Sequence, residues 1–335
     1  MFVYDTRNQE EEKMRKNVKK VIAPLLAAAM ALSCTVCVSA AEDETIKLTV
    51  WGAEEDQNLL KELTDKFQEK YADQKFDIQI GVESESTAKD TILTDVEAGA
   101  DVYAFADDQL TDLVKAGALL KLDDYAEALQ LADTTLDDVK AANVEGAIDA
   151  ASWDSLLEAA DKAGKKVGMT LASGNLVACV SGTWDAITAQ DVFGDGYAAT
   201  KLPTFTVGDK QVQQGSVAGY KYVGVNGYSE NSGWAVLLAE DFTNEESQQI
   251  FFDQRESGSS NKNVAASDSV QENVALAALA AQSEYAHAQK VGGKYWDPAQ
   301  TFGELVAQGT LSADDDNAIQ EALDNLVDGV TAPVE

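Results

Sequence analysis

Near its start the chain alternates between strand-like and helix-like segments, and this alternation restricts it to a small set of folds. Residues 45–51 and 76–82 alternate apolar and polar side chains, as half-buried strands do. Residues 56–71 and 86–96 carry apolar side chains at helical spacing, and residues 101–110 form an apolar run that leads into another helix. This β-α-β-α-β-α order predicts a largely parallel sheet with helices on both of its faces.

The run Asp101–Leu110 ends in one aromatic ring and two carboxylates, at the point where the third predicted strand stops. In open α/β sheets, ligands bind in the crevice at the carboxyl ends of the strands. Phe105 can stack on the apolar face of a sugar ring, and Asp108 can accept hydrogen bonds from its hydroxyls. The alternative is that Phe105 belongs to the core and that Asp107 or Asp108 only caps the next helix.

A second unit of helices and short strands is predicted to begin near residue 150. Glu145–Gly146 and the Gly227 region are candidate crossovers between the two units. The predicted strands of the later part are 167–171, 176–180, 202–207 and 220–225, and its predicted helices are 153–163, 233–242, 269–290 and 314–330.

Residues 14–41 have the pattern of a secretory signal. A basic start is followed by the apolar run 21–32 and by a small-residue cleavage site at 38–40. The apolar run is too short for a membrane span. Residues 1–13 are polar and acidic and precede the signal, so we expect them to be a non-native extension, with Met14 as the true initiator.

The cysteines bear on how the chain is anchored and stabilised. Cys34 lies inside the signal and could carry a lipid, but Leu32 stands one place too late for a lipobox, so cleavage near Ala40 is favoured. Cys179 is the one cysteine after the signal, and its apolar surroundings predict a small core residue. A disulfide within the mature chain is therefore excluded.

Composition excludes several classes of function. The formal charge of -33 repels nucleic acid and anionic lipid, so neither is an expected partner. The single histidine, His287, excludes a His-based triad and a His-rich zinc site, and no glycine-rich nucleotide-binding motif follows the first strand. No metal or other cofactor is expected. Carboxylate pairs are so common in this chain that they give little support to a glycosidase.

Six segments, in this order behind an export signal, resemble the maltose/maltodextrin-binding proteins of sugar ABC importers. The resemblance covers the chain from about Thr45 onwards. The segments are Trp51–Asp56, Asp101–Gln109, Lys115–Leu120, Val180–Trp184, Lys201–Phe205 and Gly224–Ser229.

The resemblance implies a non-catalytic sugar receptor with a two-lobed, periplasmic-binding-protein-like (type II) α/β fold. A monomer would bind an oligosaccharide in the cleft between the lobes, and a membrane permease would recognise the closed form. Its compartment would be the periplasm or the outer face of the cell membrane. The implied first lobe comprises residues 42–147 and about 223–268, and the second comprises about 150–222 and 269–335.

The resemblance also implies a set of ligand-binding residues. Phe105 matches the aromatic after the third strand and Asp108 the acidic residue that binds hydroxyls, while Gln109 replaces a frequent arginine. Trp184 matches the stacking tryptophan of the other lobe, with a core position at a strand end as the alternative. The remaining candidates are the polar turn Glu54, Glu55 and Asp56, and Trp296 near the family's late aromatic platform.

Two segments of the family pattern are missing, after Val144–Gly146 and near Asn175. The second lobe is therefore expected to be reduced, with apolar surface left exposed. The leading function is capture of maltose or a maltodextrin. The alternatives are a non-binding remnant of such a receptor and an exported glycoside hydrolase.

Overall fold

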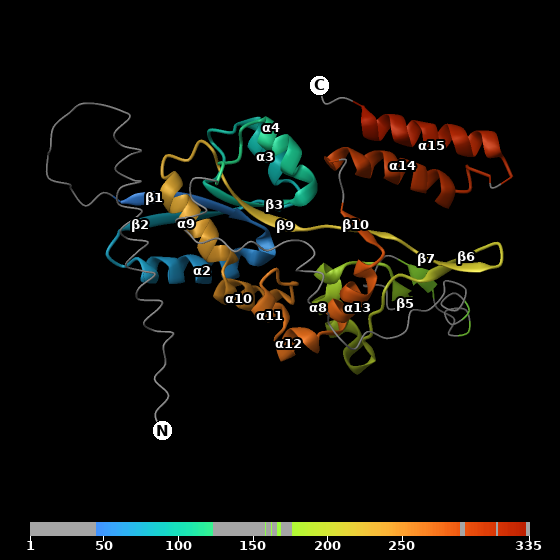
Figure 1. Cartoon of the computed structure of the whole chain (residues 1–335), viewed down its shortest axis with the longest axis horizontal. Helices are drawn as coiled ribbons and strands as arrows, with labels where there is room; N and C mark the ends of the chain where they lie inside the picture. Colours follow the sequence, from blue (N-terminus) through green and yellow to red (C-terminus); the bar gives the residue numbers. More distant parts are fainter. Residues whose placement is uncertain are drawn as a thin grey trace.

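The computed structural model describes residues 45–122, 158, 162, 166–168, 176–288, 292–312 and 314–332. The predicted extension, the export signal, Cys34, the crossover at 145–146 and the helix at 153–163, apart from its residues 158 and 162, lie outside the described residues. Figure 1 shows two groups of elements joined side by side, one around strands β1, β2, β3 and β9 and one around helices α8, α13, α14 and α15.

The first group is built on a four-stranded sheet with the order β2-β1-β3-β9. The strands are β1 (Ile46–Gly52), β2 (Phe76–Val82), β3 (Val102–Ala106) and β9 (Lys221–Val225). The first three are parallel, as the sequence pattern predicts, whereas β9 runs antiparallel to β3. The chain therefore leaves this sheet after β3 and returns to it more than a hundred residues later.

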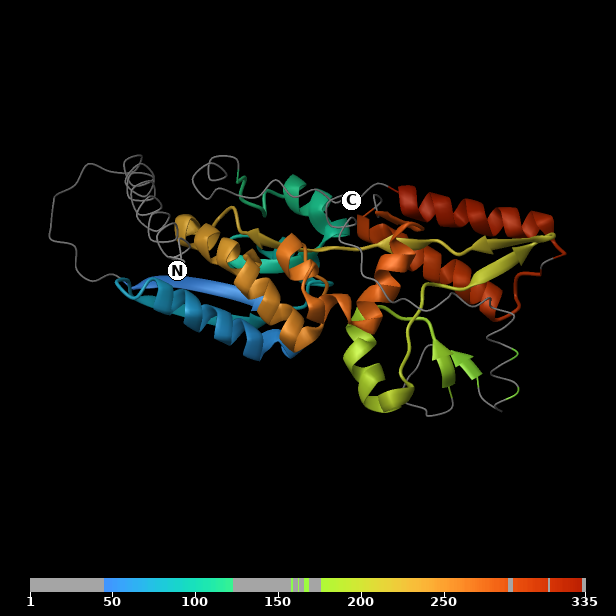
Figure 2. The same cartoon turned by 60° about the horizontal axis from the view of Figure 1, so that its bottom comes forward.

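Helices cover both faces of this sheet, as predicted. Helices α2 (Gln57–Lys70), α9 (Ser232–Thr243) and α10 (Glu245–Arg255) pack together on one face, where Figure 2 shows α2 in blue beside the orange pair. The short helices α3 (Ala88–Thr94) and α4 (Leu110–Lys115) cover the other face.

Helix α2 forms because its apolar side chains recur at helical spacing. Leu59, Leu60, Leu63 and Phe67 are all buried against the sheet and α9. At its end, the Lys70 ammonium forms an ion pair with the buried Asp241 carboxylate of α9. Burial opposes the charged ammonium, but the hydrogen bond and charge of Asp241 outweigh it and raise the pKa of Lys70.

The second group contains small sheets and several helices. Its strands pair as β4 (Lys166–Gly168) with β5 (Leu176–Cys179), β6 (Thr204–Val207) with β7 (Lys210–Gln213), and β8 (Ser216–Ala218) with β10 (Ala286–Ala288). Helix α11 (Lys262–Ala265) packs on α10, and the helices of the second group are α8 (Ala186–Phe193), α12 (Asp268–Gln271), α13 (Val274–Ser283), α14 (Trp296–Ala307) and α15 (Asp316–Thr331).

The single helix predicted over 269–290 is wrong. Helix α12 ends at Gln271, and α13 begins anew because the Asn273 side chain accepts a hydrogen bond from the Leu276 amide. After α13 the chain becomes strand β10, so His287 lies on a strand and not on a helix. Pairing with β8 outweighs the helical preference of this alanine-rich segment.

The last two helices of the second group bury few of their side chains. Helix α14 buries none of its residues and α15 buries only Ala322, although both carry an apolar stripe. Val207, Val306 and Val327 are each more than half exposed. This agrees with the exposed apolar surface expected from the missing segments. No helix among the described residues is both long and apolar enough to cross a bilayer.

Candidate functional site

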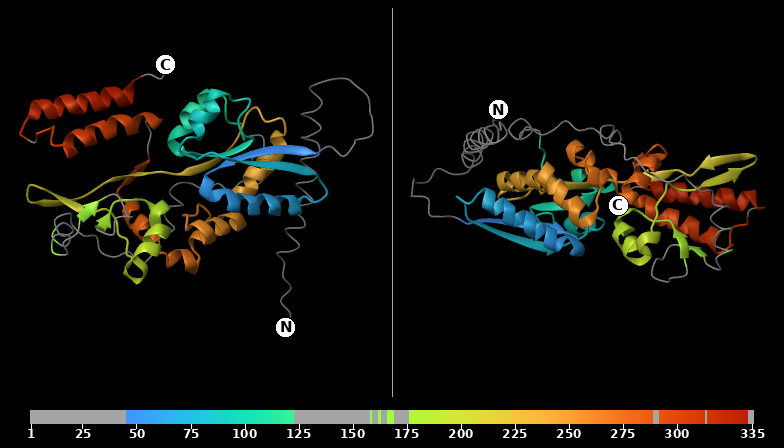
Figure 3. Two further views of the ribbon diagram at one scale, coloured as in Figure 1. Left: turned by 180° about the vertical axis from the view of Figure 1, so that it is seen from behind. Right: turned by 90° about the horizontal axis from the view of Figure 1, so that it is seen from below.

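The candidate site lies where the two groups of elements meet, at the carboxyl ends of β1 and β3. Short 3-10 turns follow these strands, η1 (Glu54–Asp56) and η2 (Asp107–Gln109). The turn η6 (Gly292–Tyr295), which leads into α14, contacts η2 and α4 from the other group. Figure 1 and the left view of Figure 3 both place the start of α14 beside α4.

Trp296 and Asp108 come together across this junction. The indole Nε1 of Trp296 donates a hydrogen bond to Oδ2 of Asp108 at 3.3 Å. The Trp296 side chain is 54% exposed, and the ring of Tyr295 stands edge-on to it at 5.4 Å. Two residues that the sequence assigned to ligand binding are thus adjacent, one from each group.

Phe105 does not line the site, so the predicted stacking role for its ring is wrong. Its side chain is 2% exposed and packs with Tyr103, Ile92 and Leu113 beneath α3 and α4. Gly224 makes room for it, since a Cβ there would lie 2.8 Å from Cε1 of Phe105. The core alternative from the sequence is therefore the correct one for this residue.

Gln109 is a structural residue, and the predicted contact with a ligand is wrong. Its side chain is buried. The amide nitrogen donates to the carbonyl oxygens of Glu85 at 2.9 Å and Ser86 at 2.8 Å, and the amide oxygen accepts from the Lys89 amide at 3.2 Å. A neutral amide can make all three bonds because it both donates and accepts. Gln109 thus joins the loop after β2 to the turn after β3.

The polar turn η1 is held by a cation from α10. Glu54 and Glu55 are exposed, whereas Asp56 is partly buried. Arg255 Nε lies 3.0 Å from Asp56 Oδ1, and Arg255 Nη2 lies 3.7 Å from Glu55 Oε1. Burial raises the pKa of the Asp56 carboxyl above its ordinary value, although the Arg255 charge opposes the shift.

A second ion pair lies at the same end of the sheet. Lys221 Nζ is 2.7 Å from Glu85 Oε1, between the start of β9 and the loop after β2. Burial favours the neutral acid, but the hydrogen bond and charge of Lys221 outweigh it and lower the pKa of Glu85. Sequence reasoning missed this pair because its members lie far apart along the chain.

The Glu85–Lys221 pair predicts a pH-dependent contribution to stability. A lowered carboxyl pKa stabilises the fold above the ordinary value of about 4.3, and this contribution is lost as the pH falls through the lowered pKa. Lys221→Met should therefore reduce the free energy of unfolding at pH 7, by less than about 1 kcal/mol because Lys221 is 65% exposed. Denaturant titrations at pH 7 and pH 3 measure this difference.

The difference between Lys221→Met and the parent should shrink as the pH falls through the lowered pKa of Glu85. Lys210→Met, at an exposed lysine of β7, is the matched control. An equal loss at both pH values would show that the lysine stabilises the fold by packing and not by charge.

Trp184 is a surface residue, and a core role is excluded for it. Its side chain is 78% exposed on the turn η4 (Thr183–Asp185), between β5 and α8. The indole lies over Gly182, where any Cβ would collide with the ring. Since Phe105 is buried, the predicted arrangement with these two rings on opposite walls of one groove is absent.

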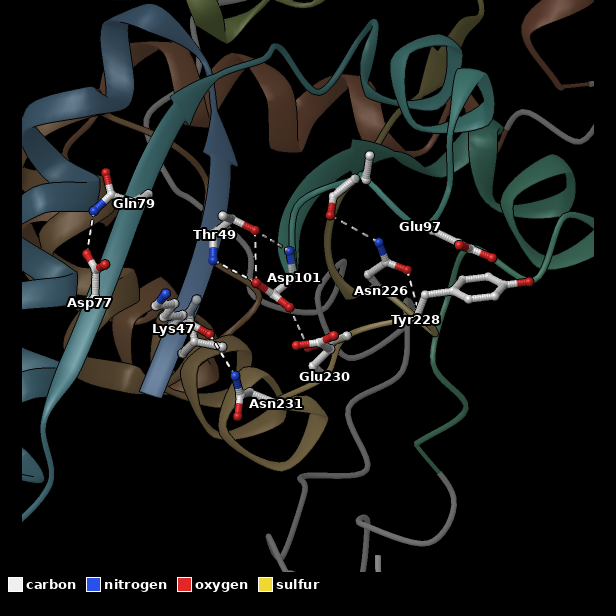
Figure 4. A pocket seen from close by; sticks show the side chains of 14 residues that line it. Lys47, Thr49, Asp77, Gln79, Glu97, Asp101, Asn226, Tyr228, Glu230 and Asn231 are labelled. Carbon is white, nitrogen blue, oxygen red and sulfur yellow. Dashed lines mark hydrogen bonds between the residues drawn. The ribbon is translucent and has the colours of Figure 1, made fainter. Parts of the chain in front are cut away.

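A hollow of about 590 Å³ lies at the opposite end of the first sheet (Figure 4). Several of its polar side chains form hydrogen bonds within the protein. Asp101 accepts hydrogen bonds from the Thr49 amide at 2.7 Å and the Thr49 hydroxyl at 2.8 Å. The amide of Asn226 donates to the carbonyl oxygens of Val96 and Gly99 and accepts from the Tyr228 amide. These bonds join the strand ends, and we assign no ligand to this hollow.

Asn226→Ala should lower the free energy of unfolding by about 1–3 kcal/mol, because it removes three partly buried hydrogen bonds to the backbone. Asn226 itself is 1% exposed. Chemical denaturation measures the effect. Asn231→Ala is the control, since Asn231 is only partly buried and its side chain donates a single bond, to the Lys47 carbonyl. A loss no larger than that of the control would contradict the structural role of Asn226.

The chain was compared with protein families, curated sequences and solved structures. The family model described as bacterial extracellular solute-binding protein matches residues 162–278. No curated protein sequence matches the chain significantly.

Solved structures resemble the chain over most of its length. A structure described as being with acarbose is 25% identical, with a TM-score of 0.64 over 85% of this chain and 98% of the other. The maltodextrin-binding protein MalE1 from L. casei BL23, without ligand, is 21% identical, with a TM-score of 0.64 over 86% and 99% of the two chains. A cyclo/maltodextrin-binding protein complexed with maltotetraose is 16% identical, with a TM-score of 0.63 over 88% and 100%.

The chain thus has a two-lobed α/β fold, and its residues 162–278 are similar to the family of bacterial extracellular solute-binding proteins. Its architecture is that of the maltose/maltodextrin-binding proteins. The matched family and two of the structures reported above are described as binding proteins. Among the described residues, no group of His, Cys, Asp and Glu is arranged to hold a metal ion.

Proposed function

We propose that the protein captures an α-glucan oligosaccharide, maltose or a maltodextrin, for import by an ABC transporter. In this proposal the segment 14–41 directs export, and the receptor acts as a monomer in the periplasm or at the outer face of the membrane. Residues 42–147 with about 223–268 form one lobe, and the remaining segments form the other. A membrane permease is the partner, and the receptor does not cleave its ligand.

The observation that carries this proposal is the Trp296–Asp108 contact at the junction of the two groups. An exposed indole offers a flat apolar surface to a sugar ring, and a carboxylate accepts hydrogen bonds from hydroxyls. The pair lies at the carboxyl end of β3, where open α/β sheets bind their ligands. The likeness to structures solved with acarbose and with maltotetraose supports the same ligand class.

Titration calorimetry with maltose, maltotriose and maltotetraose tests the proposal. We expect heat and a saturable isotherm with at least one of them, and none with the β-linked control cellotriose. Chromatography of maltotetraose after overnight incubation should show the sugar intact. Absence of heat with all three glucans, for protein shown to be folded by circular dichroism, would contradict the proposal.

The second candidate is a non-binding remnant of such a receptor. It is favoured by the second group of elements, in which α14 and α15 together bury only Ala322. A remnant should unfold at low temperature, with no shift of its melting temperature when sugar is added. A shift with maltotriose and none with cellotriose would exclude it.

A further inference from the structure

An exposed aromatic ring lies beside Phe105, the residue for which the sequence predicted stacking on a sugar. Tyr222 of β9 is the direct partner of Phe105 in the antiparallel register, so both side chains lie on the same face of the sheet. The two rings meet at 5.6 Å with an interplanar angle of 61°. Phe105 is 2% exposed, whereas Tyr222 is 42% exposed. Phe105 therefore supports the Tyr222 ring from the side of the core.

A carboxylate lies next to this ring. The Asp107 amide donates a hydrogen bond to the Tyr220 carbonyl at 2.9 Å, which joins the end of β3 to the start of β9. Burial raises the pKa of the Tyr220 and Tyr222 hydroxyls, and the charge of Asp107 adds to both shifts. Asp107 and the two tyrosines thus share one neighbourhood at the carboxyl end of β3. The neighbouring Asp108 already accepts a hydrogen bond from the Trp296 indole.

We infer that Tyr222 and Asp107 form a sugar-binding contact of the first group, with Tyr222 in place of Phe105 and Asp107 in addition to Asp108. This inference rests on the function proposed above. The Tyr222 ring stacks on the apolar face of one glucose unit, and Asp107 accepts hydrogen bonds from hydroxyls at its edge. Phe105 is a positioning residue that fixes the plane of the Tyr222 ring. Because Asp107 and Asp108 repel an anion, the contact favours neutral sugars over uronic acids.

Site-directed variants test the inference by calorimetry with maltotriose. Tyr222→Ala should weaken binding about 10- to 100-fold, whereas Tyr222→Phe keeps the ring and should stay within about threefold of the parent. Tyr228→Ala is the matched control, because Tyr228 is 49% exposed but follows the other end of β9. It should leave the affinity unchanged.

Tyrosine nitration of the unaltered protein gives a measurement that does not depend on the folding of a variant. Tetranitromethane should modify Tyr222, and maltotriose should protect Tyr222 but not Tyr228, as read by peptide mass spectrometry. If the parent binds maltotriose but Tyr222 is not protected, or Tyr222→Ala binds as the parent does, the inference is overturned and the proposed function stands. If the parent binds no glucan, both are overturned.

Discussion

Replacing Phe67 with alanine is expected to lower the free energy of unfolding by about 3–5 kcal/mol. The Phe67 side chain is 0% exposed. Its ring lies 4.9 Å from that of Tyr71 and 5.4 Å from that of Phe76, so it fills the space between α2 and β2. Alanine would leave a cavity that the rigid sheet cannot close. Urea titration followed by circular dichroism measures the loss.

Phe205→Ala is the matched control for this prediction. The same side chain is removed there, but Phe205 is 42% exposed on β6 and belongs to the second group. Its loss should cost less than about 1 kcal/mol. If the two variants lost equal stability, the core beneath the first sheet would not be what holds the fold together.

The second large effect is expected on sugar binding, from the double variant Trp184→Ala/Trp296→Ala. Each indole is mostly exposed, at 78% and 54%, so each can give its face to a sugar ring without refolding. Loss of one stacking platform costs about 1–3 kcal/mol. If the two contributions add, the double variant loses about 2–6 kcal/mol of binding free energy, which is at least about 30-fold in affinity.

The double variant Trp184→Phe/Trp296→Phe is the control, since it keeps two aromatic faces and should retain most of the affinity. Thermal unfolding of both variants should match that of the parent, because the exposed indoles contribute little to the core. Calorimetry with maltotriose reads the affinities. Alanine and phenylalanine variants that bind equally well would exclude stacking on these rings.

The first sheet could be predicted from the sequence because its signals are local. The alternation in 45–51 and the helical spacing in 56–71 report burial on one face, and both elements are present as β1 and α2. The antiparallel partner of β3 could not be assigned in this way. Residues 220–225 are predicted as a strand, but nothing local says that they pair with Ala106 and Val102.

The candidate site was less predictable than the sheet. Strand β3 is apolar on both faces, so its pattern does not tell which ring points to solvent and which to the core. The pattern therefore favoured Phe105, and the exposed ring belongs to Tyr222 on the neighbouring strand. The contact of Trp296 with Asp108 joins residues 188 positions apart and depends on how the two groups of elements pack.

The three hydrogen bonds of Gln109 have a consequence for the thermodynamics of ligand capture. They link the loop around Glu85 and Ser86 to the turn that carries Asp107, so hydrogen bonds hold these two segments together. In the proposed function these two segments are already held in place before a ligand binds. Binding should therefore cost the protein little conformational entropy in these segments. Gln109→Ala removes these hydrogen bonds, so the two segments would have to become ordered when the ligand binds. Calorimetry should then show a less favourable binding entropy, although the proposed contacts to the sugar are unchanged.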